Sequence, residues 1–147
     1  MKDNVITAYF MRVDEEEGIP YKGYLSTIEN TLSAKQRYVN FDEDGGLIEV
    51  VHLNREIDVI CHDEGKILGY PINRAWVDKD GEVIELFAGN ILAVRHSEDE
   101  FASISEADIP HIKKHLCPVV VLNGGIVLKV PEEDLPEYKG VDDGNTN

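Results

Sequence analysis

Short runs of β-forming residues, each closed by a turn signal, are the feature of this sequence that most restricts its fold. Asp78-Lys79-Asp80-Gly81 and Asn123-Gly124-Gly125 carry the Asp-Gly and Asn-Gly pairs that are typical of tight turns. Because runs on either side of such turns pair with each other, the chain predicts a largely antiparallel sheet. The runs expected to form strands are 5–13, 47–53, 57–61, 82–87, 91–96, 119–122 and 126–130.

One short helix is expected near residue 30. Ser26 and Glu29 match a capping box, in which two side chains satisfy backbone N–H groups at a helix start. Ile28 and Leu32 are four residues apart and would share one face of a helix. A helix is therefore predicted from Ser26 to about Arg37.

A second short helix is expected after residue 105. Ser105 is one candidate for its N-cap, with Asp108 three residues later, but Pro110 fits the first turn better if Asp108 is the cap. Two short helices beside an antiparallel sheet predict a single α+β domain over residues 1–130. The acidic residues 131–147 are expected to be a flexible tail.

Length and charge limit the classes of function. The chain has 147 residues, of which 42% are hydrophobic, enough for one domain with one core. Its formal charge of -15, from 29 acidic and 14 basic residues, repels phosphates and argues against general nucleic-acid binding. No apolar run is long enough to span a membrane and no signal-peptide pattern is present, so a cytoplasmic location without membrane association is expected.

The acidic excess is partly concentrated in two segments, residues 14–17 and 131–147. Segments of this kind are usually solvated. They also suggest a class of function in which a negative surface imitates DNA and inhibits a host DNA-binding or restriction protein. We keep this DNA mimic as an alternative hypothesis.

Several motifs in the chain resemble one protein family. They are Gly46-Leu-Ile-Glu-Val-Val-His-Leu53, Glu64-Gly65-Lys66, Gly69-Tyr-Pro-Ile-Asn-Arg-Ala75, Gly89 and Glu100-Phe101-Ala-Ser103. The stretch from about Leu25 to Leu116 resembles the domain of unknown function numbered 3846, a family of small proteins carried by phages, plasmids and conjugative elements. The resemblance implies no activity. It implies an accessory gene of a mobile element, and from that setting we expect a role in countering host defence.

Glu49 is a charged residue in a largely apolar strand. Alternation along residues 47–53 puts it on the same face as apolar neighbours, where a carboxylate needs a partner. Arg74 or Lys66, from a segment 66–76 expected to be an ordered loop or a turn of helix, would supply the positive charge. The first interpretation is therefore a structural ion pair between this segment and the sheet.

The second interpretation is a ligand site formed by the same part of the chain. Arginine binds carboxylates and phosphates, asparagine binds an amide or a base edge, and tyrosine stacks on planar rings. A small nucleotide signal of host defence is the expected ligand, since sequestration needs a pocket and no catalysis. The candidate ligand-binding residues are Glu49, Lys66, Tyr70, Asn73 and Arg74.

Catalytic and metal-binding patterns are weak. His111 and His115 are four residues apart on a predicted helix, but the other candidate zinc ligands, Cys61 and His62, are adjacent on a strand and point to opposite faces. No nucleophile motif or phosphate-binding loop is present. We expect no metal, no cofactor and a non-enzymatic protein. A small enzyme acting through Glu49 or a Cys/His metal site is the third hypothesis.

Two further expectations concern the cysteines and self-association. Cys61 and Cys117 are expected to be buried free thiols, because small secreted domains usually carry more than one disulfide and nothing else in the sequence suggests secretion. The apolar hairpin 119–130 either closes the sheet or presents an edge to a second copy. We therefore expect a homodimer. Apart from a second copy, the expected partner is a small molecule or a host protein.

Overall fold

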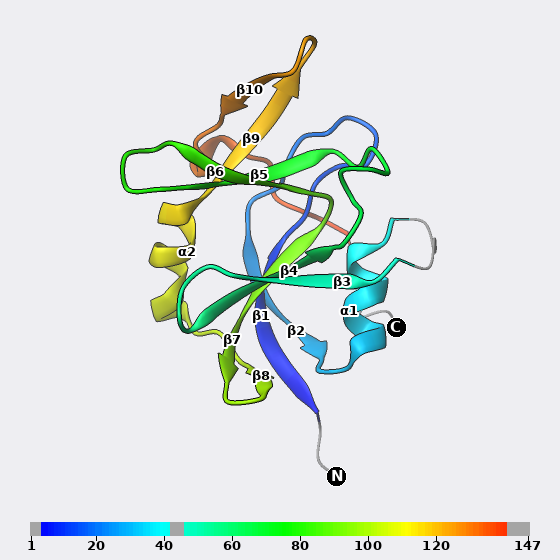
Figure 1. The fold of residues 1–147 in the computed structure, drawn as a ribbon, viewed down its shortest axis with the longest axis vertical. Coiled ribbons are helices and arrows are strands. Elements are labelled where there is room, and N and C mark those ends of the chain that lie inside the picture. The colour runs from blue at the N-terminus through cyan, green and yellow to red at the C-terminus, as the bar shows by residue number, and fades with distance from the viewer. Residues whose placement is uncertain (1–3, 42–45, 141–147) are drawn as a thin grey trace.

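The computed structural model describes residues 4–41 and 46–140 of the chain. These residues form two antiparallel sheets and two α-helices (Figure 1), which confirms the predicted α+β class. The strands expected from the sequence are present, each with its ends shifted by a few residues at most. The main difference from the expectation is that the strands form two sheets and not one. This division was not predictable, because it depends on pairing between strands far apart in the sequence.

The larger sheet contains β1 (Val5–Met11), β2 (Tyr24–Glu29), β3 (Ile48–His52), β4 (Ile57–His62), β7 (Ile91–Ser97) and β8 (Glu100–Ala102). Its order is β2-β1-β7-β4-β3, and β8 pairs with β7. All neighbouring strands are antiparallel. The predicted hairpin between residues 47 and 61 is confirmed as β3–β4.

The smaller sheet contains β5 (Ile72–Val77), β6 (Val83–Ala88), β9 (Leu116–Leu122) and β10 (Ile126–Lys129), in the order β10-β9-β5-β6. The prediction of a loop or helical turn over 66–76 is wrong from Ile72 onward, where the chain is the central strand β5. The polar pair Asn73-Arg74 interrupts the apolar pattern of this strand. Both side chains are nevertheless buried, because other parts of the chain satisfy their polar groups.

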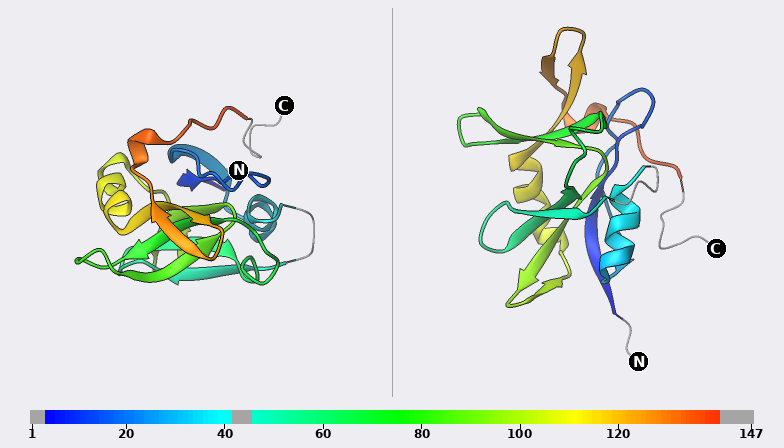
Figure 2. Two further views of the ribbon diagram at one scale, coloured as in Figure 1. Left: turned by 90° about the horizontal axis from the view of Figure 1, so that it is seen from above. Right: turned by 45° about the vertical axis from the view of Figure 1, so that its right-hand side comes forward.

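Both faces of the larger sheet are buried at its centre, along β4 and most of β7. Along β7, Ile91 and Ala93 pack into a core shared with the smaller sheet and α2 (Ile109–His115). Leu92 and Val94, on the opposite face, pack in a second core with α1 (Leu32–Val39). The two helices accordingly lie on opposite sides of the larger sheet (Figures 1 and 2). A strand covered on both faces is apolar throughout rather than alternating.

The helix prediction at Ser26 is wrong, and the capping-box pattern there has another basis. Residues Tyr24–Glu29 form β2, which pairs with β1 and buries Ile28. Helix α1 starts later, and its N-cap is Thr31, whose hydroxyl accepts a hydrogen bond from the Ala34 amide at 3.1 Å. Pairing with β1 therefore outweighs the local helix-start signal.

At the second helix, both residues that the sequence offered as the N-cap, Ser105 and Asp108, have a capping role. Ser105 and Asp108 form a capping box around a short 3-10 helix, η1 (Glu106–Asp108). Helix α2 then begins at Ile109, with Pro110 in its first turn. Among the described residues, no helix is both long and apolar enough to span a membrane.

The acidic C-terminal segment is packed where it is described. It contains the 3-10 helix η2 (Glu132–Asp134), and Leu135 after it is buried. The Lys22 amide donates to Pro136 O at 2.8 Å, and the Tyr138 ring lies 4.4 Å from the Arg12 guanidinium carbon. Residues 131–140 therefore differ from the flexible tail expected over 131–147, and residues 141–147 lie outside the described part.

The hairpin β9–β10 projects from the body of the molecule (Figure 1). Its exposed apolar side chains are Val121, Leu122, Ile126 and Leu128. The expected homodimer concerns this edge of the smaller sheet and stays a prediction. Cys61 and Cys117 are both free thiols, as expected, but only Cys61 is buried and Cys117 is half-buried.

Candidate functional site

Asn73 connects the two sheets through a buried hydrogen-bond network. Its Nδ2 donates to Met11 O at 2.8 Å and to Gly89 O at 2.9 Å. Its Oδ1 accepts from Arg74 Nη1 at 2.7 Å. Met11 ends a strand of the larger sheet and Asn73 lies on β5 of the smaller one, so these bonds fix how the sheets meet.

Arg74 is the second member of this network and is 1% exposed. Its Nη2 donates to Tyr21 O at 3.0 Å and lies 3.5 Å from Glu132 Oε1. Burial lowers the pKa of Arg74, and the nearby Glu132 carboxylate opposes that effect. Both residues of the Asn73-Arg74 pair therefore have internal partners, but the carboxylate beside Arg74 is that of Glu132 and not that of Glu49, which the sequence suggested.

Tyr70 has a packing role as well. Its ring contacts the His62 ring edge-on, with centroids 5.0 Å apart, and lies 4.8 Å from the Phe41 ring. Its hydroxyl accepts a hydrogen bond from the Phe41 amide at 3.3 Å. These contacts hold the segment after β4 against the end of α1.

Glu49 and Lys66, in contrast, are exposed and line one cleft. Lys66 forms an ion pair with Glu85, not with Glu49. Glu49 lies on the expected strand face, opposite Cys61 in the hairpin register. The expectation of a carboxylate in the core is wrong, because the buried part of this face does not reach as far as Glu49.

The cleft has a volume of about 450 Å³ and is lined by β3, β4, β5, β6 and the segment after β4. Half-buried Trp76 and buried Phe87 belong to its apolar lining. Five charged residues surround these rings, and they are Glu49, Asp63, Glu64, Lys66 and Glu85. An aromatic lining with charged groups around it is an arrangement typical of small-molecule sites.

Cys61 and His62 lie at the edge of this cleft, and the Cys61 thiol is held in an unreactive state. Burial raises the pKa of the Cys61 thiol to about 12, with a further contribution from Glu49. A thiol with such a pKa is protonated at neutral pH and is a poor nucleophile. His62 is buried, and its Nδ1 accepts a hydrogen bond from the Glu64 amide at 2.9 Å.

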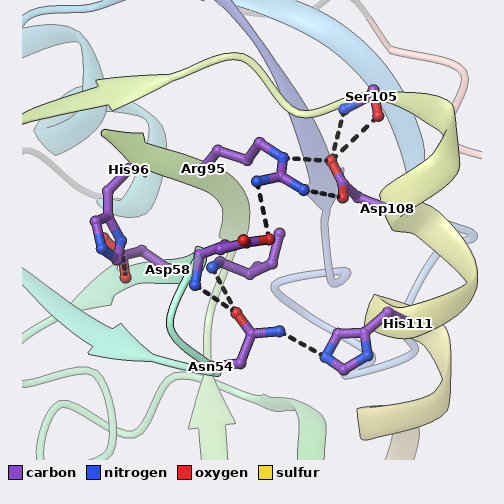
Figure 3. A network of polar contacts seen from close by, with 9 residues as sticks. Asn54, Asp58, Arg95, His96, Ser105, Asp108 and His111 are labelled. Atoms are coloured by element: carbon purple, nitrogen blue, oxygen red, sulfur yellow. Dashed lines mark hydrogen bonds and ion pairs between the residues drawn. The ribbon is translucent and has the colours of Figure 1, made fainter. Parts of the chain in front are cut away.

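A second polar cluster, which we call the His-Asp cluster, consists of His52, Asp58 and His96. His52 lies directly opposite Asp58 in the β3–β4 register, and its Nδ1 is 2.6 Å from Asp58 Oδ1. Asp58 pairs with Val94, which places His96 two residues further along β7 on the same face. His96 Nδ1 is 3.1 Å from the same carboxylate oxygen (Figure 3).

Burial differs strongly within the His-Asp cluster. The Asp58 side chain is 3% exposed, whereas the side chains of His52 and His96 are 70% and 29% exposed. His96 Nδ1 is buried and makes no hydrogen bond to any described residue, because its contact with Asp58 lacks hydrogen-bond geometry. The cluster lies in a cavity of about 550 Å³, whose lining also includes Lys35 and Phe101.

The sequence analysis missed the His-Asp cluster, although part of the signal was available. A hairpin whose loop is Asn54-Arg55-Glu56 pairs residue 53 with 57, and therefore His52 with Asp58. A histidine and an aspartate facing each other across a hairpin are a possible ligand pair. The third member was not predictable, because the pairing of β4 with β7 joins segments distant in the sequence.

The zinc ligands considered from the sequence do not come together. Among the described residues, the three chelating groups found within 4.8 Å of one another are those of the His-Asp cluster. His111 Nε2 lies 2.8 Å from Asn54 Nδ2, and His115 Nδ1 lies 3.5 Å from Val77 O. Burial lowers the pKa of His111, and the neighbouring His115 and Lys114 lower it further.

The fold and its cavities define a small α+β protein of two antiparallel sheets with a ligand-sized cleft where they meet. The model of a family described as a domain of unknown function, DUF3846, matches residues 9–117, and the chain belongs to that family. The match begins at Tyr9 in β1, so it extends further toward the N-terminus than the resemblance seen in the sequence, which begins at about Leu25. No curated protein and no solved structure matches the chain.

Proposed function

We propose that the protein is a non-enzymatic binding protein that takes a small ligand into the cleft lined by Glu49, Lys66 and Trp76. The observation that carries this proposal is the cleft itself, a cavity of about 450 Å³ in which an indole ring is accessible beside charged groups. Cavities of a few hundred Å³ suit small organic ligands. The indole supplies a flat surface on which a planar group stacks.

The charges of the lining define the class of ligand. Within the described part of the chain, four carboxylates surround the cleft, those of Glu49, Asp63, Glu64 and Glu85, and Lys66 is the one lysine or arginine in its lining. This balance disfavours an anionic ligand, including the nucleotide signal suggested by the sequence. A cation is attracted both by the carboxylates and by the face of Trp76. The proposed ligand is therefore a planar organic compound with a positive charge.

A binding role fits the chemistry of the cleft better than catalysis does. The Cys61 thiol, which is the natural nucleophile there, is held protonated by burial. Lys66, the other candidate for a chemical role, forms an ion pair with Glu85. A role in mobile-element counter-defence is a hypothesis that rests on the family resemblance. The DNA-mimic alternative has less support, because Glu132 of the acidic segment points inward to Arg74.

The chain has a single tryptophan, and it lines the cleft, so its fluorescence reports on ligands there. We would titrate three probes with the same ring: adenosine, AMP and 1-methyladenosine, which is cationic at neutral pH. The proposal expects the cation to change Trp76 fluorescence at the lowest concentration and AMP at the highest. Glu49→Gln should weaken the response to the cation, whereas Glu29→Gln, an exposed change on β2, should not.

Native mass spectrometry of the protein purified from its source would identify the natural ligand by mass. A small molecule that is lost on denaturation supports the proposal. The proposal fails if the native and denatured masses agree and none of the three probes alters Trp76 fluorescence up to about 1 mM, a concentration that detects even weak sites.

A further inference from the structure

We propose that His52, Asp58 and His96 form a binding site for one divalent transition-metal ion. The sequence analysis predicted no metal, and this site is separate from the proposed ligand cleft. The three residues come from three neighbouring strands of the larger sheet, β3, β4 and β7. Strands hold side chains more rigidly than loops do, which favours a preformed site.

The distances within the cluster fit ligands that share one ion. Metal–nitrogen and metal–oxygen bonds to Zn²⁺ are about 2.0–2.2 Å, so two ligand atoms in a tetrahedral arrangement are about 3.4 Å apart. Asp58 Oδ1 lies 2.6 Å from His52 Nδ1 and 3.1 Å from His96 Nδ1. All three ligand atoms are within 4.8 Å of one another. Small side-chain rotations therefore suffice to admit an ion.

A second observation that supports a metal site is the environment of one nitrogen of His96. His96 Nδ1 is buried and has no hydrogen bond to any residue that the structure describes, although Asp58 Oδ1 is close to it. Buried polar atoms nearly always have a partner, and an atom without one calls for an explanation. A bound ion would give this nitrogen a ligand role and would neutralise the buried carboxylate of Asp58.

The ligand set indicates the class of metal. Two imidazoles and one carboxylate suit zinc and the other divalent first-row metals better than magnesium or calcium, which prefer oxygen ligands alone. Three protein ligands leave coordination positions open, as in catalytic rather than structural zinc sites. Here those positions would open into the cavity of about 550 Å³ around the cluster.

The charges near the cavity also favour a cation. Glu98, Asp99 and Glu100 follow β7 and belong to the cavity lining. The Lys35 ammonium group at the same cavity is already bound to Asn30 Oδ1 at 2.7 Å and to Thr31 O at 3.3 Å. The carboxylates thus attract a divalent ion, and the lysine is held by its own partners.

Zinc titration of the full chain tests the site. Protein stripped with a chelator would be titrated with Zn²⁺ in competition with a chromophoric chelator, and its melting temperature would be measured with and without Zn²⁺. His52→Gln is the principal variant, because this side chain is 70% exposed and its replacement should not disturb folding. His111→Gln is the matched control, since it also removes one imidazole but from the pair on α2.

We expect one Zn²⁺ per chain, a rise in melting temperature on binding, and an affinity that His52→Gln and His96→Gln lower by about 100-fold or more. Loss of an outer-shell partner alone typically costs 10-fold to 100-fold, and loss of a ligand costs more. His111→Gln should bind within about twofold of the unaltered protein. No saturable binding, or binding that His111→Gln abolishes and His52→Gln leaves unchanged, would overturn the proposal.

Discussion

Glu132 Oε1 lies 3.5 Å from Arg74 Nη2, so a residue of the acidic C-terminal segment neutralises a buried arginine at the centre of the molecule. The other carboxylate oxygen, Glu132 Oε2, accepts a hydrogen bond from the Gly23 amide at 2.8 Å. Through these contacts the C-terminal segment supports the network that joins the two sheets. It lies outside the region matched by the family model, which ends at Cys117.

Replacing Glu132 with alanine should therefore destabilise the protein. The change leaves Arg74 buried without its carboxylate, and breaking a buried ion pair in this way typically costs about 3–5 kcal/mol. Glu133→Ala is the matched control, because Glu133 is exposed and surface changes usually alter stability by less than about 0.5 kcal/mol. Urea unfolding measures both. Equal unfolding free energies for the two variants would show that the Arg74 contact contributes nothing.

The second prediction concerns the pH dependence of stability. Arg95 donates two hydrogen bonds to Asp108, from Nη2 at 2.8 Å and from Nε at 2.9 Å (Figure 3). These bonds lower the pKa of Asp108 below its ordinary value of 3.8, and the Ser105 amide contributes further. Because the folded state lowers this pKa, the stabilisation is present above pH 3.8 and is lost as the pH falls through the folded pKa.

Asp108→Asn should accordingly cost about 2 kcal/mol near neutral pH, where charged hydrogen bonds are lost. The difference from the unaltered protein should be smaller at an acidic pH well below 3.8, because the Asp108 carboxylate loses its charge as the pH falls through its lowered folded pKa. Urea unfolding at both pH values provides the measurement. A difference that stays constant between them would show that the Asp108 charge does not stabilise the fold.

Sequence reasoning succeeded where local patterns determine the structure. The β3–β4 and β9–β10 hairpins follow from apolar runs and turn residues, and their register follows from the turns. It failed at Ser26, where a strand partner distant in sequence overrides a helix-start signal. It also failed at β5, because burial of Asn73 and Arg74 depends on partners from β1 and the C-terminal segment.

The candidate site was also predicted only in part, where local patterns were enough. Glu49 and Lys66 were identified from their sequence context, and the structure places both at one cleft. Trp76 was not among the predicted ligand-binding residues, because its place in the lining depends on how the two sheets meet. His96 joins His52 and Asp58 only through the β4–β7 pairing, which no local pattern encodes.

The third prediction concerns self-association through the projecting hairpin. Strand β10 is an edge of the smaller sheet, and its exposed residues Ile126 and Leu128 are apolar. An exposed apolar edge strand is a common pairing surface. We expect native mass spectrometry to show a dimer that Leu128→Lys converts to a monomer. Ile67→Lys, which also removes an exposed apolar side chain, should leave the dimer intact, and a monomeric unaltered protein would contradict the prediction.

The last prediction concerns Tyr9, whose ring is buried in the core between the sheets. Its hydroxyl is buried without a hydrogen-bond partner among the described residues, and burial raises its pKa, with Glu132 adding to the rise. Since an unsatisfied buried hydroxyl carries a desolvation cost, Tyr9→Phe should stabilise the protein by about 1 kcal/mol. Thermal and urea unfolding provide the measurement.

Gly23 supplies the companion variant, because a Cβ at this position would overlap both Oη and Cζ of Tyr9. Gly23→Ala should therefore destabilise the protein by about 1–3 kcal/mol, as overpacking of a core typically does. Combining it with Tyr9→Phe should restore only part of this loss, since the ring carbon still obstructs the added methyl group. Full recovery in the double variant would mean that the hydroxyl alone limits the space at residue 23, and a destabilising Tyr9→Phe would mean that the hydroxyl has a partner.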